Sequence, residues 1–252
     1  MGISQSVPAY DSQSKEYEQA FEVFLKNTNQ KRNMHQWLQK VVEKLPAKQV
    51  FIDAGAGDGE VTRWFTPLFQ KTIAIEPNPF LREKLHSAIP EATIIDKTIM
   101  EADPQATADL VLCSHILYYI DKNQWLQNLE KLVSWLSPSG SVIIVLQNPN
   151  TDCMNLLEHF INQRFDLSQV AEQFAKKHGE NYEINLCCDG AQIEAPDFSS
   201  ALTISIFMLN LLPMPHPLSE TELEYYISSH FLKEDHIYRF SCNQDFLQIR
   251  KK

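Results

Sequence analysis

The sequence predicts an α/β fold built on a mostly parallel β-sheet, and three observations carry this prediction. Short apolar segments, typical of buried strands, recur along the first two thirds of the chain. These segments are 49–54, 72–75, 92–95, 108–113 and 141–146. Helical segments separate them, as βαβ units require. A glycine-rich turn follows the first apolar segment directly, at the edge where open parallel sheets bind ligands.

The helices are expected where apolar residues recur every three or four positions. The expected helical segments are 16–44 with a break near 27–29, 60–69, 78–88, 122–136, 152–165, 167–177 and 219–228. Turns are expected at 138–140 and 213–217, and the stretch 181–203 has no clear period. Segments 237–242 and 246–250 alternate in polarity and predict a terminal antiparallel hairpin that completes the sheet. Residues 1–14 are expected to be a tail or a loose flap.

Composition limits the class of protein. A chain of 252 residues can form one domain, and we expect a single one, with an N-terminal helical cover (1–47), a binding core (48–147) and substrate-side helices with closing strands (148–252). No apolar run reaches the about 20 residues of a membrane span, and no signal-peptide core is visible. A cytoplasmic location away from membranes is therefore expected.

Charge and cysteine content argue against a nucleic-acid partner, a disulfide framework and a zinc site. The formal net charge of -10 disfavours a nucleic-acid partner, which would need a basic surface. The five cysteines show no C-x-x-C spacing, so neither a disulfide framework nor a zinc site is indicated, and no metal is expected. The sequence leaves the oligomeric state open.

The strongest local signal is the octapeptide Asp53-Ala54-Gly55-Ala56-Gly57-Asp58-Gly59-Glu60. Glycines at alternate positions let the backbone turn sharply and approach a ligand, and the following helix offers N–H groups at its start. The spacing is G-x-G-x-G rather than the G-x-G-x-x-G of dinucleotide-binding folds, which disfavours a dehydrogenase. The acidic residue Asp53 stands two positions before the first glycine. A tight turn without a ligand is the alternative.

Other polar residues end the following strands at the same edge. Glu76 follows the second strand, where a carboxylate can accept both hydroxyls of a ribose, and Pro77 adjoins it. Asp96 follows the third strand and is a candidate for an adenine amino group or an ordinary helix cap. Ser114 ends the fourth strand. Together these positions predict a nucleoside-binding edge.

The glycine loop, Glu76 and the strand order resemble the class I S-adenosylmethionine-dependent methyltransferase family over residues 48–147. The resemblance implies an enzyme with a Rossmann-like sheet and S-adenosylmethionine as its cofactor. The amino-acid tail of this cofactor has an ammonium group, which Asp53 suits. The residues that it implies for cofactor binding are Asp53, Gly55, Gly57, Gly59, Glu76, Pro77, Asp96 and Ser114.

Other segments resemble the histamine N-methyltransferase family. These are Tyr17-x-x-x-Phe21-x-x-Phe24-Leu25, Asn27-Thr28-Asn29-Gln30 with Met34, Ile116-Leu117-Tyr118-Tyr119-Ile120, Leu211-Leu212-Pro213-x-Pro215 and the closing strand from Phe240 to Ile249. The resemblance implies N-terminal helices over the site and a small amine or azole acceptor. Three family contacts differ here: an acidic residue aligns with Gln30, a glutamine with His115, and an asparagine with Cys242 or, one residue along, Asn243.

His115 is the candidate catalytic residue, because methyl transfer needs a neutral acceptor and a general base helps to keep it so. A packing role for His115 is the alternative. Candidate substrate contacts are Tyr17, Gln30, His115, Tyr119 and Cys242. The expected function is methyl transfer to a small-molecule acceptor at an amine or azole nitrogen. Methylation of a hydroxyl group, of a protein or an RNA, and binding of S-adenosylmethionine without catalysis remain alternatives.

Overall fold

The computed structural model describes residues 6–10, 14–214 and 216–252, and two compact units can be distinguished in it. Unit 1 comprises the described residues of Met1–Met34, Gln147–Phe165 and Asp189–Gln244. Unit 2 comprises His35–Leu146, Asp166–Cys188 and Asp245–Lys252. Each unit is described by itself. The expected single domain with boundaries at 47 and 147 stays a prediction.

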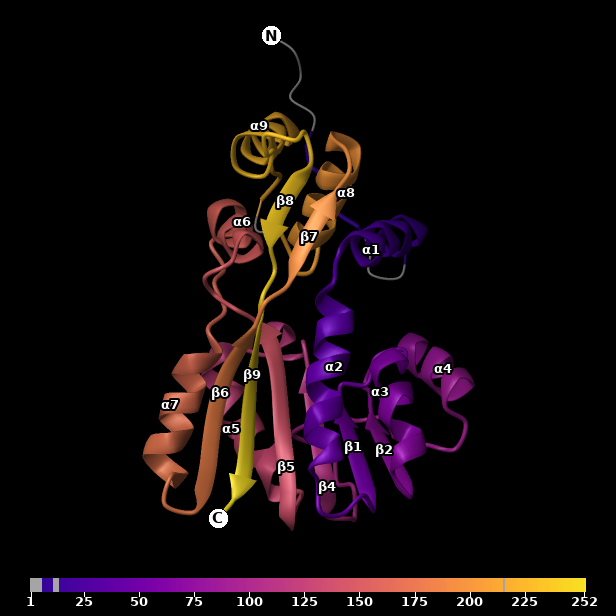
Figure 1. Ribbon diagram of the computed structural model, residues 1–252. Helices are drawn as coiled ribbons and strands as arrows, with labels where there is room; N and C mark the ends of the chain where they lie inside the picture. The colour runs from indigo at the N-terminus through magenta and orange to yellow at the C-terminus, as the bar shows by residue number, and fades with distance from the viewer. Residues whose placement is uncertain (1–5, 11–13, 215) are drawn as a thin grey trace. The chain divides into compact units, whose positions relative to one another are not determined.

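Unit 2 is built on a seven-stranded sheet with the strand order β3-β2-β1-β4-β5-β9-β6 (Figure 1). The strands are β1 Val50–Ala54, β2 Lys71–Ile75, β3 Thr93–Ile95, β4 Ala108–Ser114, β5 Leu136–Gln147, β6 Tyr182–Asp189 and β9 Gln244–Lys251. The pairs β1–β2, β1–β4, β2–β3 and β4–β5 are parallel. The Rossmann-like α/β fold predicted from the sequence is therefore confirmed.

The central strands are apolar because they are buried on both faces, as in other parallel sheets. The helical segments of unit 2 are the later turns of α2 Gln30–Glu43, then α3 Glu60–Phe65, η1 Thr66–Leu68, α4 Pro79–Ala88, η2 Leu117–Tyr119, η3 Lys122–Gln124, α5 Trp125–Ser134 and α7 Leu167–His178. On α2, Trp37 stacks on Phe246 of β9 with ring centroids 4.2 Å apart. The strands β1, β2 and β4 are almost wholly buried.

One expected turn lies inside a strand. The segment 138–140 belongs to β5, which begins at Leu136 opposite Ala108 and shifts its register before Leu110 pairs with Ser141. Gly140 fits this irregularity because a Cβ there would lie 2.4 Å from the Ala108 carbonyl oxygen. The turn signal thus marks a bulged strand start.

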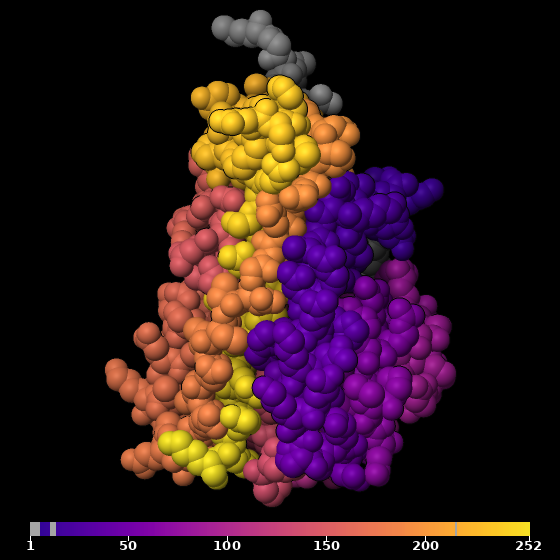
Figure 2. Space-filling view, in the orientation of Figure 1, coloured from indigo at the N-terminus to yellow at the C-terminus, as the bar shows by residue number. Residues whose placement is uncertain are grey.

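Unit 1 contains helices and a small antiparallel sheet. Its elements are α1 Lys15–Asn27, the first residues of α2, α6 Asp152–Ile161, α8 Phe198–Leu209, α9 Glu220–His230 and the strands β7 Gln192–Ala195 and β8 Tyr238–Ser241. Strands form at both C-terminal segments as expected, but β8 pairs with β7, whereas β9 lies between β5 and β6. In the space-filling view, β7 and β8 lie side by side on the visible face (Figure 2).

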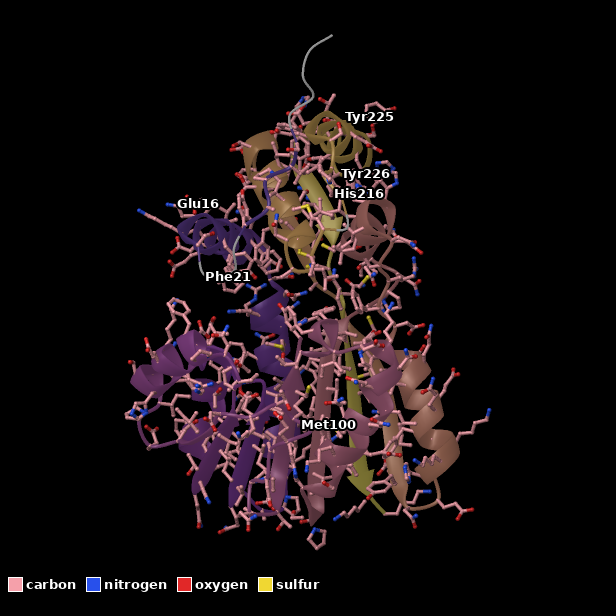
Figure 3. The ribbon with its side chains drawn as sticks, turned by 180° about the vertical axis from the view of Figure 1, so that it is seen from behind. Glu16, Phe21, Met100, His216, Tyr225 and Tyr226 are labelled. Atoms are coloured by element: carbon pink, nitrogen blue, oxygen red, sulfur yellow. The ribbon has the colours of Figure 1, made fainter. Side chains whose placement is uncertain are left out.

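The core of unit 1 includes an aromatic cluster between α1 and α8. Phe207 is buried, and the rings of Tyr17, Phe21 and Phe24 lie with their centroids 5.3 to 5.4 Å from its own. Phe21 is labelled on α1 in Figure 3. The face of α1 that the sequence predicted to be apolar is therefore the face that contacts α8.

The N-terminal segment makes hydrogen bonds to the rest of unit 1 where it is described. The Val7 amide donates to the Leu218 carbonyl at 2.8 Å, and the Tyr10 amide donates to Asn210 Oδ1 at 2.7 Å. Residues 1–5 and 11–13, and residue 215 of the expected turn at 213–217, lie outside the described residues. Among the described residues, no helix has both the length and the apolarity to cross a bilayer.

Candidate functional site

The glycine loop between β1 and α3 has the backbone geometry that its sequence predicts. Gly55, Gly57 and Gly59 have φ angles of 87°, 59° and 86°, in the left-handed region that glycine tolerates best. The Gly55 amide donates to the Ile75 carbonyl at 2.8 Å, which ties the loop to the end of β2. A Cβ on Gly55 would lie 2.3 Å from Ile116 Cδ1, so another part of the chain packs closely on this glycine.

Glu76 links the glycine loop to the start of α4. Its Oε2 accepts a hydrogen bond from the Gly57 amide at 2.9 Å, and its Oε1 accepts one from the Asn78 amide at 2.8 Å. The side chain is buried, with 5% of its surface exposed. Each carboxylate oxygen has two lone pairs, so the two backbone donors leave acceptor capacity on both oxygens.

These features fit the nucleoside end of S-adenosylmethionine. A Cβ on Gly57 would have no atom within 4 Å, so there is open space above this part of the loop. A pre-oriented carboxylate beside it can accept the two hydroxyls of a ribose. Glu76 would hold the ribose, and the loop amides would contact the amino-acid tail of the ligand.

The other predicted cofactor residues lie at strand ends of unit 2. Pro77 is exposed and its carbonyl accepts a hydrogen bond from Arg82 Nη1 at 2.6 Å. Asp96 follows β3 directly and is exposed, and Ser114 is the last residue of β4 and half-buried. Their contacts with a cofactor stay predictions.

Asp53 lies near the end of β1, and only 2% of its surface is exposed. Its Oδ2 accepts a hydrogen bond from the Thr62 hydroxyl at 2.6 Å. Burial raises the pKa of Asp53 to about 7, the Thr62 hydrogen bond opposes this rise, and the charge of Glu76 adds to it. The carboxyl group is thus poised to change its protonation near neutral pH, and its contact with an ammonium group stays a prediction.

His115 follows β4 in a strained backbone conformation. Its φ is 58°, which is uncommon for a residue with a side chain, and its amide donates to the Val145 carbonyl at 2.9 Å. The ring Nδ1 lies 3.3 Å from the Tyr118 hydroxyl. For His115 to accept a proton at Nε2, its Nδ1 must carry the hydrogen and donate a hydrogen bond to the Tyr118 hydroxyl.

Tyr119 lies in η2, close enough to Glu76 to be affected by its charge. The pKa of Tyr119 is raised mainly by desolvation of its hydroxyl group, and the negative charge of Glu76 raises it further. The residue as a whole is 64% exposed, so this desolvation is local to the hydroxyl. A predicted substrate residue therefore lies near a predicted cofactor residue in unit 2.

In unit 1, Gln30 and Cys242 are in direct contact. Gln30 Nε2 donates to the Cys242 carbonyl at 3.0 Å, and the Gln30 amide donates to Thr28 Oγ1 at 3.2 Å. Thr28 Oγ1 also lies 3.5 Å from Cys242 Sγ. Gln30 and Cys242 are both buried, so the Gln30 side chain is not simply a polar group in contact with solvent. Tyr17, the third predicted contact here, packs on Phe207 in the aromatic cluster.

Sequence reasoning missed several supporting residues. Thr62 binds Asp53 and Ile116 covers Gly55, and neither has a local signature. Asn78 does have one: an asparagine before proline is typical of a helix N-cap, and its side chain accepts from the amides of Phe80 and Leu81.

A cavity of about 580 Å³ opens in unit 1, and its lining includes none of the predicted cofactor residues. Its lining comprises Asn29, Asp152, Gly190, Ala191, Gln192, Lys233, Arg239, Phe240, Ser241 and Asn243. Arg239 is ion-paired with Glu194 and Asp235. Throughout the ranges that the structure describes, no three His, Cys, Asp or Glu side chains gather into a group that can hold a metal ion.

Comparison with known proteins identifies the family. A family model for a methyltransferase domain matches residues 26–186. An uncharacterized methyltransferase of Alkaliphilus oremlandii (strain OhILAs) is 24% identical over 109 residues, which cover 42% of this chain and 50% of that protein. The matched region thus spans half the length of this curated relative.

Solved structures show the same fold at low sequence identity. The YcgJ protein of Bacillus subtilis is 13% identical with a TM-score of 0.61, over 86% of this chain and 99% of that one. The N-methyltransferase NodS of Bradyrhizobium japonicum WM9, solved with S-adenosyl-L-homocysteine, is 14% identical with a TM-score of 0.53, over 70% of this chain and 90% of that one. Both similarities concern the fold alone.

Proposed function

The chain belongs to the methyltransferase-domain family, and from this membership we propose that it methylates a nitrogen atom of a small molecule, an amine or an azole. Membership confirms the predicted enzyme class, an S-adenosylmethionine-dependent methyltransferase, and its cofactor. The acceptor class follows the resemblance to the histamine N-methyltransferase family and the chemistry of the residues below. The net charge of -10 supports a small acceptor over a nucleic acid.

The reaction sets two tasks for the side chains. When bound, S-adenosylmethionine supplies a methyl group on a sulfonium centre. The acceptor nitrogen must be aligned with that carbon and must keep its lone pair unprotonated. His115 is proposed as the general base, because imidazole is the side chain that changes protonation near neutral pH. Tyr118 would set the tautomer that makes this possible.

The observation that carries the proposal is the orientation of the Gln30 amide. Its Nε2 is committed to the Cys242 carbonyl, which fixes which end of the amide is the oxygen. Gln30 then offers Oε1, an acceptor, to a bound ligand. Through this oxygen Gln30 would favour a ligand with an N–H donor, and a neutral amide does so without requiring a cation. Neutral amines and N–H azoles meet both conditions.

The test is release of S-adenosylhomocysteine with paired acceptors that differ only in an N–H group. We expect turnover of amines or azoles with an N–H and about 10-fold lower kcat/KM for the partner without it. Gln30→Met should remove this preference and leave the cofactor Kd unchanged. Gln36→Met, at an exposed position of the same helix, is the matched control.

Other outcomes would point elsewhere. Turnover of phenols but not of amines or azoles would replace the proposal with O-methylation. Cofactor binding without turnover of small molecules, followed by methylation of added protein or RNA, would indicate a macromolecular acceptor. Cofactor binding with no methyl transfer to any acceptor would leave a binding function only.

A further inference from the structure

We propose that Cys153 and Cys242 form a site of reversible oxidation, at which a hydroperoxide converts their two thiols into a disulfide. Both residues belong to unit 1 and are free thiols in the structure. The disulfide itself does not depend on the identity of the methyl acceptor.

The two thiols are in contact. Cys153 lies in the first turn of α6 and Cys242 follows β8 directly. Their side chains share a hydrogen bond, and both residues are fully buried. Two sulfur atoms at hydrogen-bond range need only a small movement to reach bonding distance.

The preceding residues hold the two backbones together. Asp152 Oδ2 accepts hydrogen bonds from the Ser241 amide at 2.8 Å and from the Ser241 hydroxyl at 2.9 Å. The Asp152 amide donates in turn to Ser241 Oγ at 2.9 Å. These three bonds join the residues immediately before each cysteine. A disulfide requires neighbouring backbones in a narrow range of geometry, and this reciprocal contact keeps them adjacent.

The two thiols differ in reactivity. The hydrogen bond from Cys153 is the largest influence on Cys242 and lowers its pKa, although burial opposes this, and Thr28 lowers it further. Burial and the Cys242 contact raise the pKa of Cys153. Both chain neighbours of Cys242, Ser241 and Asn243, line the cavity of unit 1, whereas only Asp152 does so beside Cys153. Since the thiolate is the nucleophile, position and pKa together make Cys242 the attacking sulfur and Cys153 the resolving one.

The chemistry balances with a hydroperoxide as the oxidant. The Cys242 thiolate attacks a peroxide oxygen, the O–O bond breaks, and the leaving hydroxide or alkoxide takes up a proton. The resulting sulfenic acid is attacked by the Cys153 sulfur. The S–O bond breaks, and the oxygen leaves as water with the thiol proton. The thiols lose two electrons, which reduce the peroxide, and a dithiol reductant reverses the reaction.

An opening in the structure brings small molecules near the pair. The cavity of about 580 Å³ in unit 1 is lined by Asp152, Ser241 and Asn243, which are chain neighbours of the two cysteines. Neither cysteine lines the cavity itself, and the route that we propose for hydrogen peroxide, which is little larger than water, is a small opening of this wall. Cys113 is also buried, but it is not among the cysteines with a thiol partner.

Oxidation would also affect Gln30. The Cys242 carbonyl accepts a hydrogen bond from Gln30 Nε2, and Cys242 Sγ contacts Thr28. Drawing the sulfur toward Cys153 would remove the Thr28 contact and shift this carbonyl. This consequence rests on the proposed function. We expect a higher KM for the acceptor with an unchanged cofactor Kd.

The test is peptide mapping of the intact chain after treatment with hydrogen peroxide. Remaining thiols are blocked, and the protein is digested with trypsin without reduction. Cys153 lies in the tryptic peptide 132–164 and Cys242 in 240–250. We expect these two peptides to be joined, lighter by two hydrogen atoms than their sum, and separated again by dithiothreitol.

Variants separate the attacking thiol from the resolving one. Cys153→Ser should leave Cys242 as a sulfenic acid that dimedone traps, whereas Cys242→Ser should leave Cys153 unmodified. Cys188→Ser, at an exposed cysteine, is the control that keeps the cross-link. Oxidation of Cys188 at peroxide doses that leave peptides 132–164 and 240–250 unlinked would overturn the proposal. A cross-link without acceptor turnover would uphold it and count against the proposed function alone.

Discussion

Replacing Asp53 with asparagine should change how the stability of the protein depends on pH. Asp53 is buried, and its pKa in the folded protein is raised from 3.8 to about 7, chiefly by burial. Between these values the folded state keeps a proton that the unfolded state has lost. The stabilisation that this group contributes is therefore fully present below about pH 4 and is lost as the pH rises to about 7. Above that pH the contribution of this group does not change further.

The size of the effect follows from the shift. About three pKa units at 1.36 kcal/mol each correspond to about 4 kcal/mol between pH 4 and pH 8. Asp53→Asn has no proton to lose, and its side-chain oxygen can still accept the Thr62 hydroxyl. The free energy of unfolding of the variant, relative to that of wild type, should therefore rise by up to about 4 kcal/mol from pH 4 to pH 8. Any constant offset that the substitution adds does not affect this change.

Urea unfolding followed by tryptophan fluorescence at pH 4 to 8 measures this difference. The matched control is Asp109→Asn. Asp109 is equally buried, but it accepts hydrogen bonds from the Gln49 and Val50 amides and the Ser137 hydroxyl, so this variant should lose stability at pH 8. A difference between Asp53→Asn and wild type that stays constant over this range would refute the reasoning.

The same variant tests the predicted cofactor contact of Asp53. An ammonium group favours the ionised carboxylate. If Asp53 faces the ammonium of the cofactor, wild-type affinity should rise as the pH passes 7, and the affinity of Asp53→Asn should not. Parallel pH profiles for both proteins in titration calorimetry would remove Asp53 from the list of cofactor contacts.

Three further predictions concern the rest of the site. Glu76→Gln should weaken cofactor binding about 10- to 100-fold, and an unchanged Kd in calorimetry would contradict the assignment. Gly59→Ala should lower the free energy of unfolding by about 2 kcal/mol, because the new Cβ would lie 2.8 Å from Leu85 Cδ1. Gly57→Ala should cost only about 1 kcal/mol yet weaken cofactor binding more, and thermal unfolding with calorimetry separates the two effects. His115→Ala should lower kcat about 100-fold with cofactor affinity retained, and Tyr118→Phe should shift the pH profile of kcat/KM. Activity equal to wild type in both would leave His115 a packing residue.

The parallel strands were predicted closely because the signal for them is local. In β1 and β2, a short apolar run is buried on both sides and ends at a polar or glycine residue, so the boundary can be read from the sequence. β6 lacks such a signal because its side chains are mostly exposed or half-buried. Helix α8 is apolar on almost every side, which removes the period by which a helix start is recognised.

The candidate site was predicted to the extent that it depends on strand ends. The glycine loop and Glu76 come from adjacent βα units, so their proximity follows from the parallel sheet. The hydrogen bond between Glu76 and the Gly57 amide has no signature of its own, nor does the positive φ of His115. Such features arise from packing between segments, and a pattern along one segment does not contain them.

Two residues of unit 1 show why contacts between distant segments resisted prediction. Gln30 and Cys242 are 212 positions apart, so no pattern in the chain links them. The contact nevertheless restricts position 30 chemically. A carboxylate there would place an acceptor oxygen against the Cys242 carbonyl oxygen, and a buried acceptor facing an acceptor is unfavourable. An amide offers a donor to that carbonyl and keeps an oxygen for a ligand. The local structure thus favours glutamine over an acid at position 30. If the proposed acceptor reaches this residue, it would bind there without a carboxylate to neutralise a positive charge.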